Sequence, residues 1–299
     1  MKFENREEWL EARRHKVMGS EIATVLNMNP YQSQLGLWAE KTGRVPGFGG
    51  NSATRIGQAL EREVANVFAE KYNILPADIV GYGMEITTAK FEEKFGATLD
   101  FFVVPFQTPL QTKTSKIRNR RNWIDGPPIQ NVLQCQWEMM VGGFESEFLA
   151  CMFGADPDEW EEVQLEADQE LHGMMCDEAY EFLKCLETDT PPEGVGAYDQ
   201  AIIKKIYPAQ ETTIWDKKTS AEVARLVIEL EQHKARKREL NAVLKPLDSE
   251  QKKIENSLRM LLAGATIGKT ENGMTVINKT TSVGEKVVAA YSFDRITVK

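Results

Sequence analysis

Histidine and cysteine are scarce in this sequence. Its 299 residues include only three histidines, His15, His172 and His233, and four cysteines, Cys135, Cys151, Cys176 and Cys185. The histidines are isolated, so no serine–histidine–aspartate or cysteine–histidine arrangement can be argued from the sequence. The cysteines form no Cys-x-x-Cys pair, which argues against a structural zinc site. We expect free, buried thiols in a reducing compartment.

Long apolar runs are also absent. No apolar stretch approaches the roughly 20 residues that a membrane-spanning helix needs. The opening segment, MKFENREEWLEARRHK, is charged and contains no apolar core of a secretion signal. Hydrophobic residues make up 42% of the chain, which is enough for one large domain, or for a core of about 200 residues plus an appendage. We therefore expect a cytoplasmic protein with no membrane partner.

Positive charge is in deficit, with a formal net charge of -9 at pH 7. The deficit comes from one segment, because residues 155–193 hold fourteen acidic residues and one lysine. The rest of the chain carries a net charge of +4. Residues 113–121 (KTSKIRNRR) hold five basic residues and no acidic one, which fits either a solvated face or a phosphate-binding surface. The acidic total therefore does not exclude a nucleic-acid partner.

The order of the predicted elements indicates an α/β fold. Apolar residues recur at the helical period over residues 5–15, 19–26, 35–41, 54–72, 129–142 and about 165–187. Shorter runs predict strands over residues 79–88, 96–104, 108–114 and 146–153. A helix, three strands, a helix and a strand in this order are typical of a central mixed β-sheet flanked by helices. We predict this core over residues 1–195 and an extension over residues 196–299.

The extension is predicted to be first helical and then β. Between residues 220 and 262, two apolar columns follow a heptad repeat, as in a coiled coil: Val223, Leu230, Leu244 and Leu258 in one, and Leu226, Leu240, Leu247, Ile254 and Leu261 in the other. Pro246 argues against one straight rod, so we predict a helical hairpin that turns near residues 245–249. An Asn272–Gly273 turn between two strands follows, and residues 287–298 are predicted to add one or two more.

Three residues carry the central chemical signal. Asp100 ends a predicted strand, and Gln111 and Lys113 lie two apart in another, so their side chains project from the same face of the sheet. A carboxylate that converges with such a pair can help to hold Mg²⁺, which polarises a phosphodiester and lowers the pKa of a bound water. A lysine beside that water can orient it and offset charge in the transition state. Taken alone, this spacing is a weak signal, because a surface aspartate and an edge-strand lysine would also fit it.

Five segments in order make the signal more specific. They are RRHKVMGSEIA at 13–23, GQALE at 57–61, ATLD at 97–100, LQTK at 110–113 and LQCQWEMMV at 133–141. Together they resemble the motifs of the lambda exonuclease and YqaJ-like viral recombinase family, which belongs to the PD-(D/E)XK superfamily of restriction-endonuclease-like folds. The resemblance covers roughly residues 8–185. Each motif is weak alone, but their common order and spacing make the resemblance strong.

The resemblance implies a role for each matching residue. The catalytic set would be Glu61, Asp100, Gln111, Lys113 and Gln134. Mg²⁺, for which Mn²⁺ can substitute, would be bound by Asp100, Gln111 and the backbone carbonyl of Thr112. The 5′-phosphate of a DNA end would be held by Arg14 and Ser20. The basic run that follows the site would contact DNA phosphates through Lys116, Arg118, Arg120 and Arg121.

The sequence departs from the family pattern at two positions. Phe101 replaces the glycine after the strand aspartate, and Gln111 replaces the metal-binding glutamate. A glutamine carbonyl can still bind Mg²⁺ but brings no negative charge, so we expect weaker metal binding and a slower reaction. Two explanations stay open: a deliberate substitution that traps the site, which we favour, and a natural protein that works with a weaker site.

The function implied by the resemblance is that of a Mg²⁺-dependent 5′-to-3′ exonuclease from a phage or prophage in a bacterial host. It would act on double-stranded DNA ends and leave 3′ overhangs for a single-strand annealing protein. The resemblance also implies a homo-oligomer, a trimeric ring around DNA, whose outside can be acidic while its channel is basic. Two alternatives stay open. One is a catalytically inactive DNA-binding protein on the same fold, and the other is a coiled-coil assembly adaptor that acts through residues 220–262.

Overall fold

The computed structural model describes residues 1–47, 49–193, 196, 199–207, 216–263, 267–269, 271 and 275–277. The chain divides into two compact units, Met1–Ala209 and Gln210–Lys299. α7 (Gln200–Ile206), which falls in the predicted extension, belongs to the first unit, and its isoleucines pack against the core of that unit. The turn predicted at residues 272–273 and the strands predicted within residues 287–298 lie outside the described residues.

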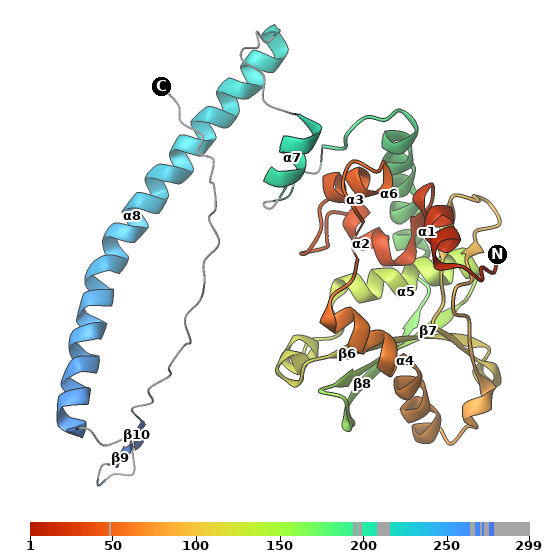
Figure 1. The fold of residues 1–299 in the computed structure, drawn as a ribbon, viewed down its shortest axis with the longest axis horizontal. Helices are drawn as coiled ribbons and strands as arrows, with labels where there is room; N and C mark the ends of the chain where they lie inside the picture. Colours follow the sequence, from red (N-terminus) through yellow and green to blue (C-terminus); the bar gives the residue numbers. More distant parts are fainter. Residues whose placement is uncertain are drawn as a thin grey trace. The chain divides into compact units, whose positions relative to one another are not determined.

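A five-stranded mixed sheet forms the centre of the first unit (Figure 1). Its strands lie in the order β2 (Ile79–Gly81), β5 (Phe101–Val103), β6 (Thr108–Ser115), β7 (Ser146–Phe153) and β8 (Asp156–Glu166). β6 and β7 run parallel, whereas the other neighbouring strands are antiparallel. β7 is buried along almost its whole length, which requires a layer of helices on each face of the sheet.

Two helices supply those layers. α4 (Ser52–Lys71) covers one face, where the ring of Phe68 packs edge-on to Phe148 of β7 at a centroid distance of 5.0 Å. α5 (Ile129–Gly142) faces the other side, toward Gln111 of β6. The predicted α/β fold with a central mixed sheet flanked by helices is therefore confirmed. Because side chains alternate along β6, its residues are shared between an apolar layer under α4 and a polar layer under α5.

A second, smaller sheet lies in the first unit. It contains β1 (Val17–Met18), β4 (Phe95–Ala97) and β3 (Thr87–Thr88), in the order β1-β4-β3. β1 pairs with β4 in parallel, and Gly96 permits this close approach, since a Cβ there would lie 2.8 Å from the sulfur of Met18. The small sheet thus joins the segment after α1 (Arg6–Arg14) directly to the strand that precedes Asp100.

Two of the predicted strands are divided between the two sheets. The strand predicted over residues 96–104 is β4 in the small sheet and β5 in the large one, with Thr98–Asp100 between them. The strand predicted over residues 79–88 is likewise β2 and β3. The prediction of single strands was wrong here, because alternation in a sequence does not reveal where a chain crosses from one sheet to another.

The remaining helices of the first unit pack around α5. They are α2 (Ile22–Val25), α3 (Gln34–Lys41) and α6 (Gln169–Glu187), and short 3-10 turns cover Gly19–Glu21, Pro76–Asp78, Val104–Phe106 and Ile117–Trp123. Trp137 of α5 and Trp38 of α3 are buried in their shared apolar core. The helices predicted in this part of the chain are confirmed, except that α6 begins after β8, a strand that the acidic composition of residues 156–166 concealed.

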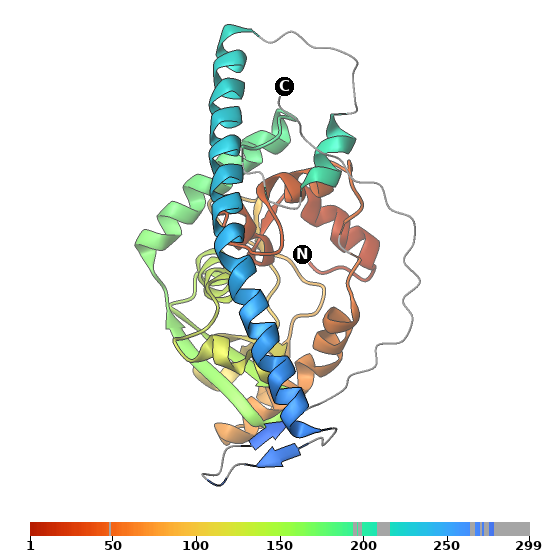
Figure 2. The ribbon, with the colours of Figure 1, turned by 90° about the vertical axis from the view of Figure 1, so that its left-hand side faces the viewer.

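The second unit contains one long helix, α8 (Lys217–Leu262), which Figure 2 shows as an unbroken ribbon. The predicted helical hairpin was wrong, since Pro246 lies inside this helix. A proline removes a single backbone hydrogen bond, and the 46 residues of α8 keep the helix continuous through it. The predicted β structure after residue 264 is confirmed by an antiparallel pair, β9 (Ile267–Lys269) and β10 (Thr275–Ile277). Within the described part of the chain, no helix is both long enough and apolar enough to span a membrane.

Candidate active site

Asp100 lies at the junction between the two sheets, directly after β4 and before β5. Its Oδ2 atom accepts hydrogen bonds from the backbone N–H of Thr112 at 2.9 Å, from the Thr112 hydroxyl at 2.8 Å and from the Gln111 amide at 2.5 Å. Three donors on one oxygen fix the carboxyl group in place and leave its other oxygen for another ligand.

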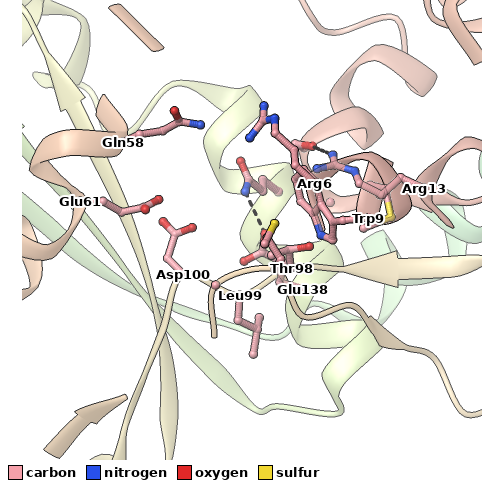
Figure 3. A pocket seen from close by; sticks show the side chains of 15 residues that line it. Arg6, Trp9, Arg13, Gln58, Glu61, Thr98, Leu99, Asp100 and Glu138 are labelled. Carbon is pink, nitrogen blue, oxygen red and sulfur yellow. Dashed lines mark hydrogen bonds between the residues drawn. The ribbon is translucent and has the colours of Figure 1, made fainter. Parts of the chain in front are cut away.

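Glu61 brings a second carboxyl group to the same place. It lies three and seven residues before Val64 and Phe68, on the buried face of α4, and it points toward Asp100 (Figure 3). Burial, the charge of Asp100 and a hydrogen bond with Asp100 raise the pKa of Glu61 to about 7, although Lys113 opposes the shift. Burial also raises the pKa of Asp100 above its ordinary value. Two crowded carboxyl groups whose charged forms are disfavoured make a good site for a cation.

Gln111 and Lys113 are brought together by Gln134 of α5. Lys113 donates to Gln134 Oε1 at 2.9 Å, and Gln134 Nε2 donates to Gln111 Oε1 at 3.0 Å. The structure therefore unites Glu61, Asp100, Gln111, Lys113 and Gln134, the five residues of the predicted catalytic set.

Glu138 is a site residue that the sequence did not single out. It lies four residues after Gln134 on the same face of α5, and its Oε1 accepts from Gln134 Nε2 at 2.8 Å. Burial and then the charge of Asp100 raise the pKa of Glu138 to about 7. Behind it, burial and the charge of Glu138 raise the pKa of Glu147. The spacing from Gln134 to Glu138 is the sequence signal that marks this residue, since it places both side chains on one face of the helix.

A cavity of about 410 Å³ opens onto these groups. Glu61 and Asp100 line one side, Arg6, Trp9 and Arg13 line the other, and the lining also includes Ser20 and Glu138, whose Oε1 lies close to Gly19. Figure 3 shows the two arginines beside the Trp9 ring. The guanidinium carbon lies 5.8 Å from the ring centroid in Arg6 and 4.4 Å from it in Arg13. Arg13 donates to the hydroxyl of Ser20 at 2.9 Å. The cavity therefore has an acidic side and a basic side.

The basic side is held in place by a buried ion pair. Lys41 of α3 lies 2.8 Å from Glu21 and donates to the carbonyls of Arg13 at 2.9 Å and Lys16 at 2.7 Å. Glu21 also accepts from the backbone N–H of Met18 at 3.1 Å. Burial lowers the pKa of Lys41, an effect that Glu21 opposes. These contacts tie the end of α1 to the turn that carries Ser20.

Arg13 occupies the place where the sequence analysis put Arg14. Arg14 is exposed and lies 3.3 Å from Glu11, and it does not line the cavity. Neighbouring helical residues point in different directions, and the structure brings Arg13 rather than Arg14 to the cavity.

The predicted basic run lies outside the cavity lining. Lys116, Arg118 and Arg121 are exposed around the 3-10 turn that follows β6. Arg120 is instead paired with carboxylates of β8, Glu159 and Glu161, the latter at 2.9 Å. The structure thus leaves three of the four basic residues exposed and pairs Arg120 with the acidic strand.

The donor set fits a divalent cation only in part. Asp100 and Glu61 offer carboxylate oxygens, but the described residues contain no group of three or more His, Cys, Asp or Glu side chains able to hold a metal ion. Gln111 turns its amide nitrogen toward Asp100 and its carbonyl toward Gln134, and that nitrogen lies 3.4 Å from the Thr112 carbonyl. A cation at Asp100 would therefore need the Gln111 amide to rotate before its oxygen could serve as a ligand.

A strand aspartate, a Gln-x-Lys strand and a helical glutamate thus lie close together on a mixed sheet flanked by helices. Residues 8–145 match the sequence model of the YqaJ-like viral recombinase domain. The resemblance to this family is confirmed, and the match covers those residues.

Individual relatives agree with this assignment. The chain is 26% identical over 270 residues to the uncharacterized protein YqaJ of Bacillus subtilis (strain 168), which covers 88% of this chain and 80% of that protein. The fold of the present chain is similar to that of LHK-Exo in complex with dAMP. The TM-score is 0.51 at 21% identity, and the match covers 61% of the present chain and 93% of the LHK-Exo chain. A structure of LHK-Exo, an alkaline exonuclease from Laribacter hongkongensis, gives a TM-score of 0.50 and 22% identity at the same coverage.

Proposed function

We propose that this chain is a metal-dependent exonuclease of phage-type recombination. It degrades one strand of double-stranded DNA in the 5′-to-3′ direction and leaves a 3′ single-stranded overhang. One observation carries the proposal: a single cavity contains the Asp100–Glu61 carboxyl pair and, opposite to it, the Arg13–Ser20 pair. The first pair suits phosphodiester hydrolysis, and the second suits a terminal phosphate.

The acidic side supplies the groups for hydrolysis. Asp100 and Glu61 would hold Mg²⁺, or Mn²⁺ in its place, together with the neutral oxygens of Gln111 and Thr112. When bound, the ion polarises the scissile phosphate and lowers the pKa of a water molecule. Lys113 orients that water and offsets negative charge in the transition state, and its contact with Gln134 fixes its amine.

The basic side supplies the recognition of the DNA end. An arginine and a phosphate form a charge-assisted and often bidentate pair, and the Ser20 hydroxyl adds a further donor. Arg13 is preorganised for this contact by the Trp9 ring and by Ser20, so little side-chain freedom is lost on binding. The exposed Lys116, Arg118 and Arg121 would add phosphate contacts that do not depend on sequence.

The names of the similar proteins support this proposal. LHK-Exo is described as an alkaline exonuclease, and one of its structures contains dAMP, a nucleotide with a single phosphate. From the motif resemblance in the sequence, we also propose that this chain forms a homotrimeric ring around DNA, works with a single-strand annealing protein and acts in the cytoplasm of a bacterium that carries the phage or prophage.

Gln111 attenuates this activity in our proposal. Its amide donates to Asp100 where a glutamate would add a third carboxylate. The same observation favours the second candidate function, a DNA-binding protein that has lost catalysis. The two functions share the basic side of the cavity and differ only in whether the acidic side cleaves DNA.

The test uses duplexes labelled at one end and carrying either a 5′-phosphate or a 5′-hydroxyl. We expect Mg²⁺-dependent release of nucleotides from the 5′ end, faster with the phosphate, and none in EDTA. DNA binding without cleavage at saturating Mg²⁺ and Mn²⁺ would support the inactive DNA-binding protein. Cleavage that starts at 3′ ends would reject the proposed polarity.

A further inference from the structure

α8 presents apolar side chains that stay exposed in the described part of the second unit. Within the described residues, none of its 46 side chains is buried. Leu240, Leu244, Leu247 and Ile254 are 50%, 52%, 55% and 63% exposed. They belong to the two heptad columns of the sequence, which place an apolar stripe, interrupted at His233, Lys237 and Gln251, along one side of the helix. A stripe of this length on an isolated helix needs an occupant.

We propose that the occupant is the α8 helix of a second copy of this chain, packed in the antiparallel direction. The proposed crossing point is level with Ala242, near the middle of the helix, so that the two stripes overlap over their whole length. This interaction surface is independent of the proposed nuclease function, since it uses no residue of the cavity.

The polar interruptions of the stripe select the antiparallel direction. In a parallel, in-register pair each of these residues meets its own copy, so Lys237 would face Lys237 in the apolar seam. In the antiparallel pair centred on Ala242, Lys237 lies opposite Leu247, and His233 lies opposite Gln251. The two copies of Lys237 are thereby separated, and the polar side chains of His233 and Gln251 share one layer.

Aliphatic residues meet at the other layers of the antiparallel pair. Val223 lies opposite Leu261, Leu226 opposite Leu258, Leu230 opposite Ile254, and Leu240 opposite Leu244. The two interrupted layers lie next to each other, and aliphatic layers lie on either side of the pair.

The charges beside the stripe point to the same direction. In the antiparallel pair, Lys234 flanks Asp248 of the other copy and Arg236 flanks Glu250, and two-fold symmetry repeats both contacts. No like charges meet at the flanking positions of this register. A parallel pair gains a Glu229–Lys234 contact but places Glu250 beside Glu255, where the charges repel. Charge complementarity thus commits the surface to a second copy rather than to an unrelated protein.

Two single-cysteine variants of the full chain distinguish the directions. Asn241→Cys lies beside the proposed two-fold axis, so two copies place their thiols near each other in the antiparallel pair and on opposite sides of a parallel pair. Val223→Cys behaves in the opposite way, because its two copies meet only in a parallel pair and lie about 57 Å apart in the antiparallel one. We expect mild oxidation to link Asn241→Cys and not Val223→Cys. The parent chain is the control for its own four cysteines.

Light scattering on the full chain measures the association itself. We expect twice the monomer mass, or an even multiple of it if rings also form. Leu240→Asp should halve the mass, whereas the matched Ile228→Asp, a 60% exposed residue on the opposite side of the helix, should leave it unchanged. A monomer at high concentration would overturn the proposal, and so would linkage of Val223→Cys. A doubled mass with neither variant linked would assign the association to another surface.

Discussion

The cavity of the first unit buries acidic side chains, whereas the stripe of α8 exposes apolar ones. Around the cavity, the carboxyl groups of Asp100 and Glu138 are taken out of water. Along α8, leucines such as Leu240 and Leu244 remain in it. Both arrangements disfavour the isolated chain, because burying a charge and exposing apolar area each cost free energy. The comparison fits our two proposals, in which the cavity binds a cation and a phosphate and the stripe of α8 packs against a second copy.

The strongest way to break this comparison is to remove the buried charge. Asp100→Ala should reduce Mg²⁺-dependent cleavage by about a thousandfold or more, a loss of roughly 4 kcal/mol of transition-state stabilisation. Because burial disfavours the charged form of Asp100, the melting temperature should fall little. Cleavage rates of labelled duplex DNA and thermal melts of the same preparations measure both quantities.

The matched control for this variant is Asp125→Ala, which removes an exposed aspartate outside the cavity. It should leave the cleavage rate unchanged. Full activity of Asp100→Ala would remove this aspartate from the reaction and, with it, the assignment of the acidic side.

A second variant adds a negative charge beside Asp100 instead of removing one. Gln111→Glu should raise cleavage by about a hundredfold to a thousandfold, equivalent to roughly 3–4 kcal/mol. The two side chains are nearly isosteric, so packing should hardly change, while a third carboxylate strengthens the site for Mg²⁺. In EDTA the variant should melt at a lower temperature than the parent, because the donor to Asp100 is replaced by a like charge.

Single-turnover digestion across a Mg²⁺ titration tests this prediction, with Gln107→Glu, on an exposed turn, as the control. A variant that is no faster at saturating Mg²⁺ would mean that β6 is not the catalytic strand. The inactive DNA-binding function would then replace the nuclease.

Much of the first unit follows from local sequence patterns. α5 and β7 begin and end where periodicity predicts, because each element is packed along its whole length. β8 was missed because its exposed side carries acidic residues, which are uncommon in strands. Long-range pairing decides that residues 96–104 belong to two sheets, and no local pattern contains that information. In α8, Pro246 suggested a break that the surrounding helix-forming residues override.

The site shows the same division between local and long-range information. Gln111 and Lys113 share one face because strand side chains alternate, so the sequence alone placed them together. The inward position of Glu138 depends on how α5 packs against the sheet. The choice of Arg13 over Arg14 depends likewise on how α1 packs beside the small sheet. The directions in which the side chains of Glu138 and Arg13 point therefore depend on the tertiary structure, which local sequence patterns do not contain.

Two neighbouring arginines provide a smaller perturbation of the cavity. Arg13→Ala should reduce the preference for 5′-phosphorylated over 5′-hydroxyl ends by about tenfold, since a charge-assisted contact contributes on the order of 1.5–3 kcal/mol. Arg14→Ala should leave the preference unchanged, because Arg14 points away from the cavity. The ratio of cleavage rates on the two substrates is the measurement. The reverse result would restore Arg14 to the role that the sequence analysis gave it.

The smallest expected effect is a dependence of stability on pH. The pKa values of Glu61 and Glu138 are both raised to about 7 in the folded protein, above the ordinary value of 4.5. Between these values the folded chain binds more protons than the unfolded chain, so stability should fall as pH rises from about 4.5 to 7. Thermal melts in EDTA should show a decrease of a few degrees over this window.

Glu138→Gln should reduce this slope, while Glu193→Gln, in a segment outside the cavity, should not. Mg²⁺ should oppose the decrease at the upper end of the window, because it binds the ionised carboxylates. A melting temperature that rises over the same range would contradict the raised pKa values.

Asp100 lies between the two sheets, and the small sheet connects it to Ser20 in the lining of the same cavity. Ser20 follows β1, β1 is paired in parallel with β4 through Val17 and Phe95, and β4 leads through only Thr98 and Leu99 to Asp100. In the proposed function, a phosphate bound by Ser20 would be connected through the paired strands β1 and β4 to the segment that carries Asp100. Binding of a DNA end would then adjust the position of the carboxyl group that is proposed to act in cleavage of the DNA.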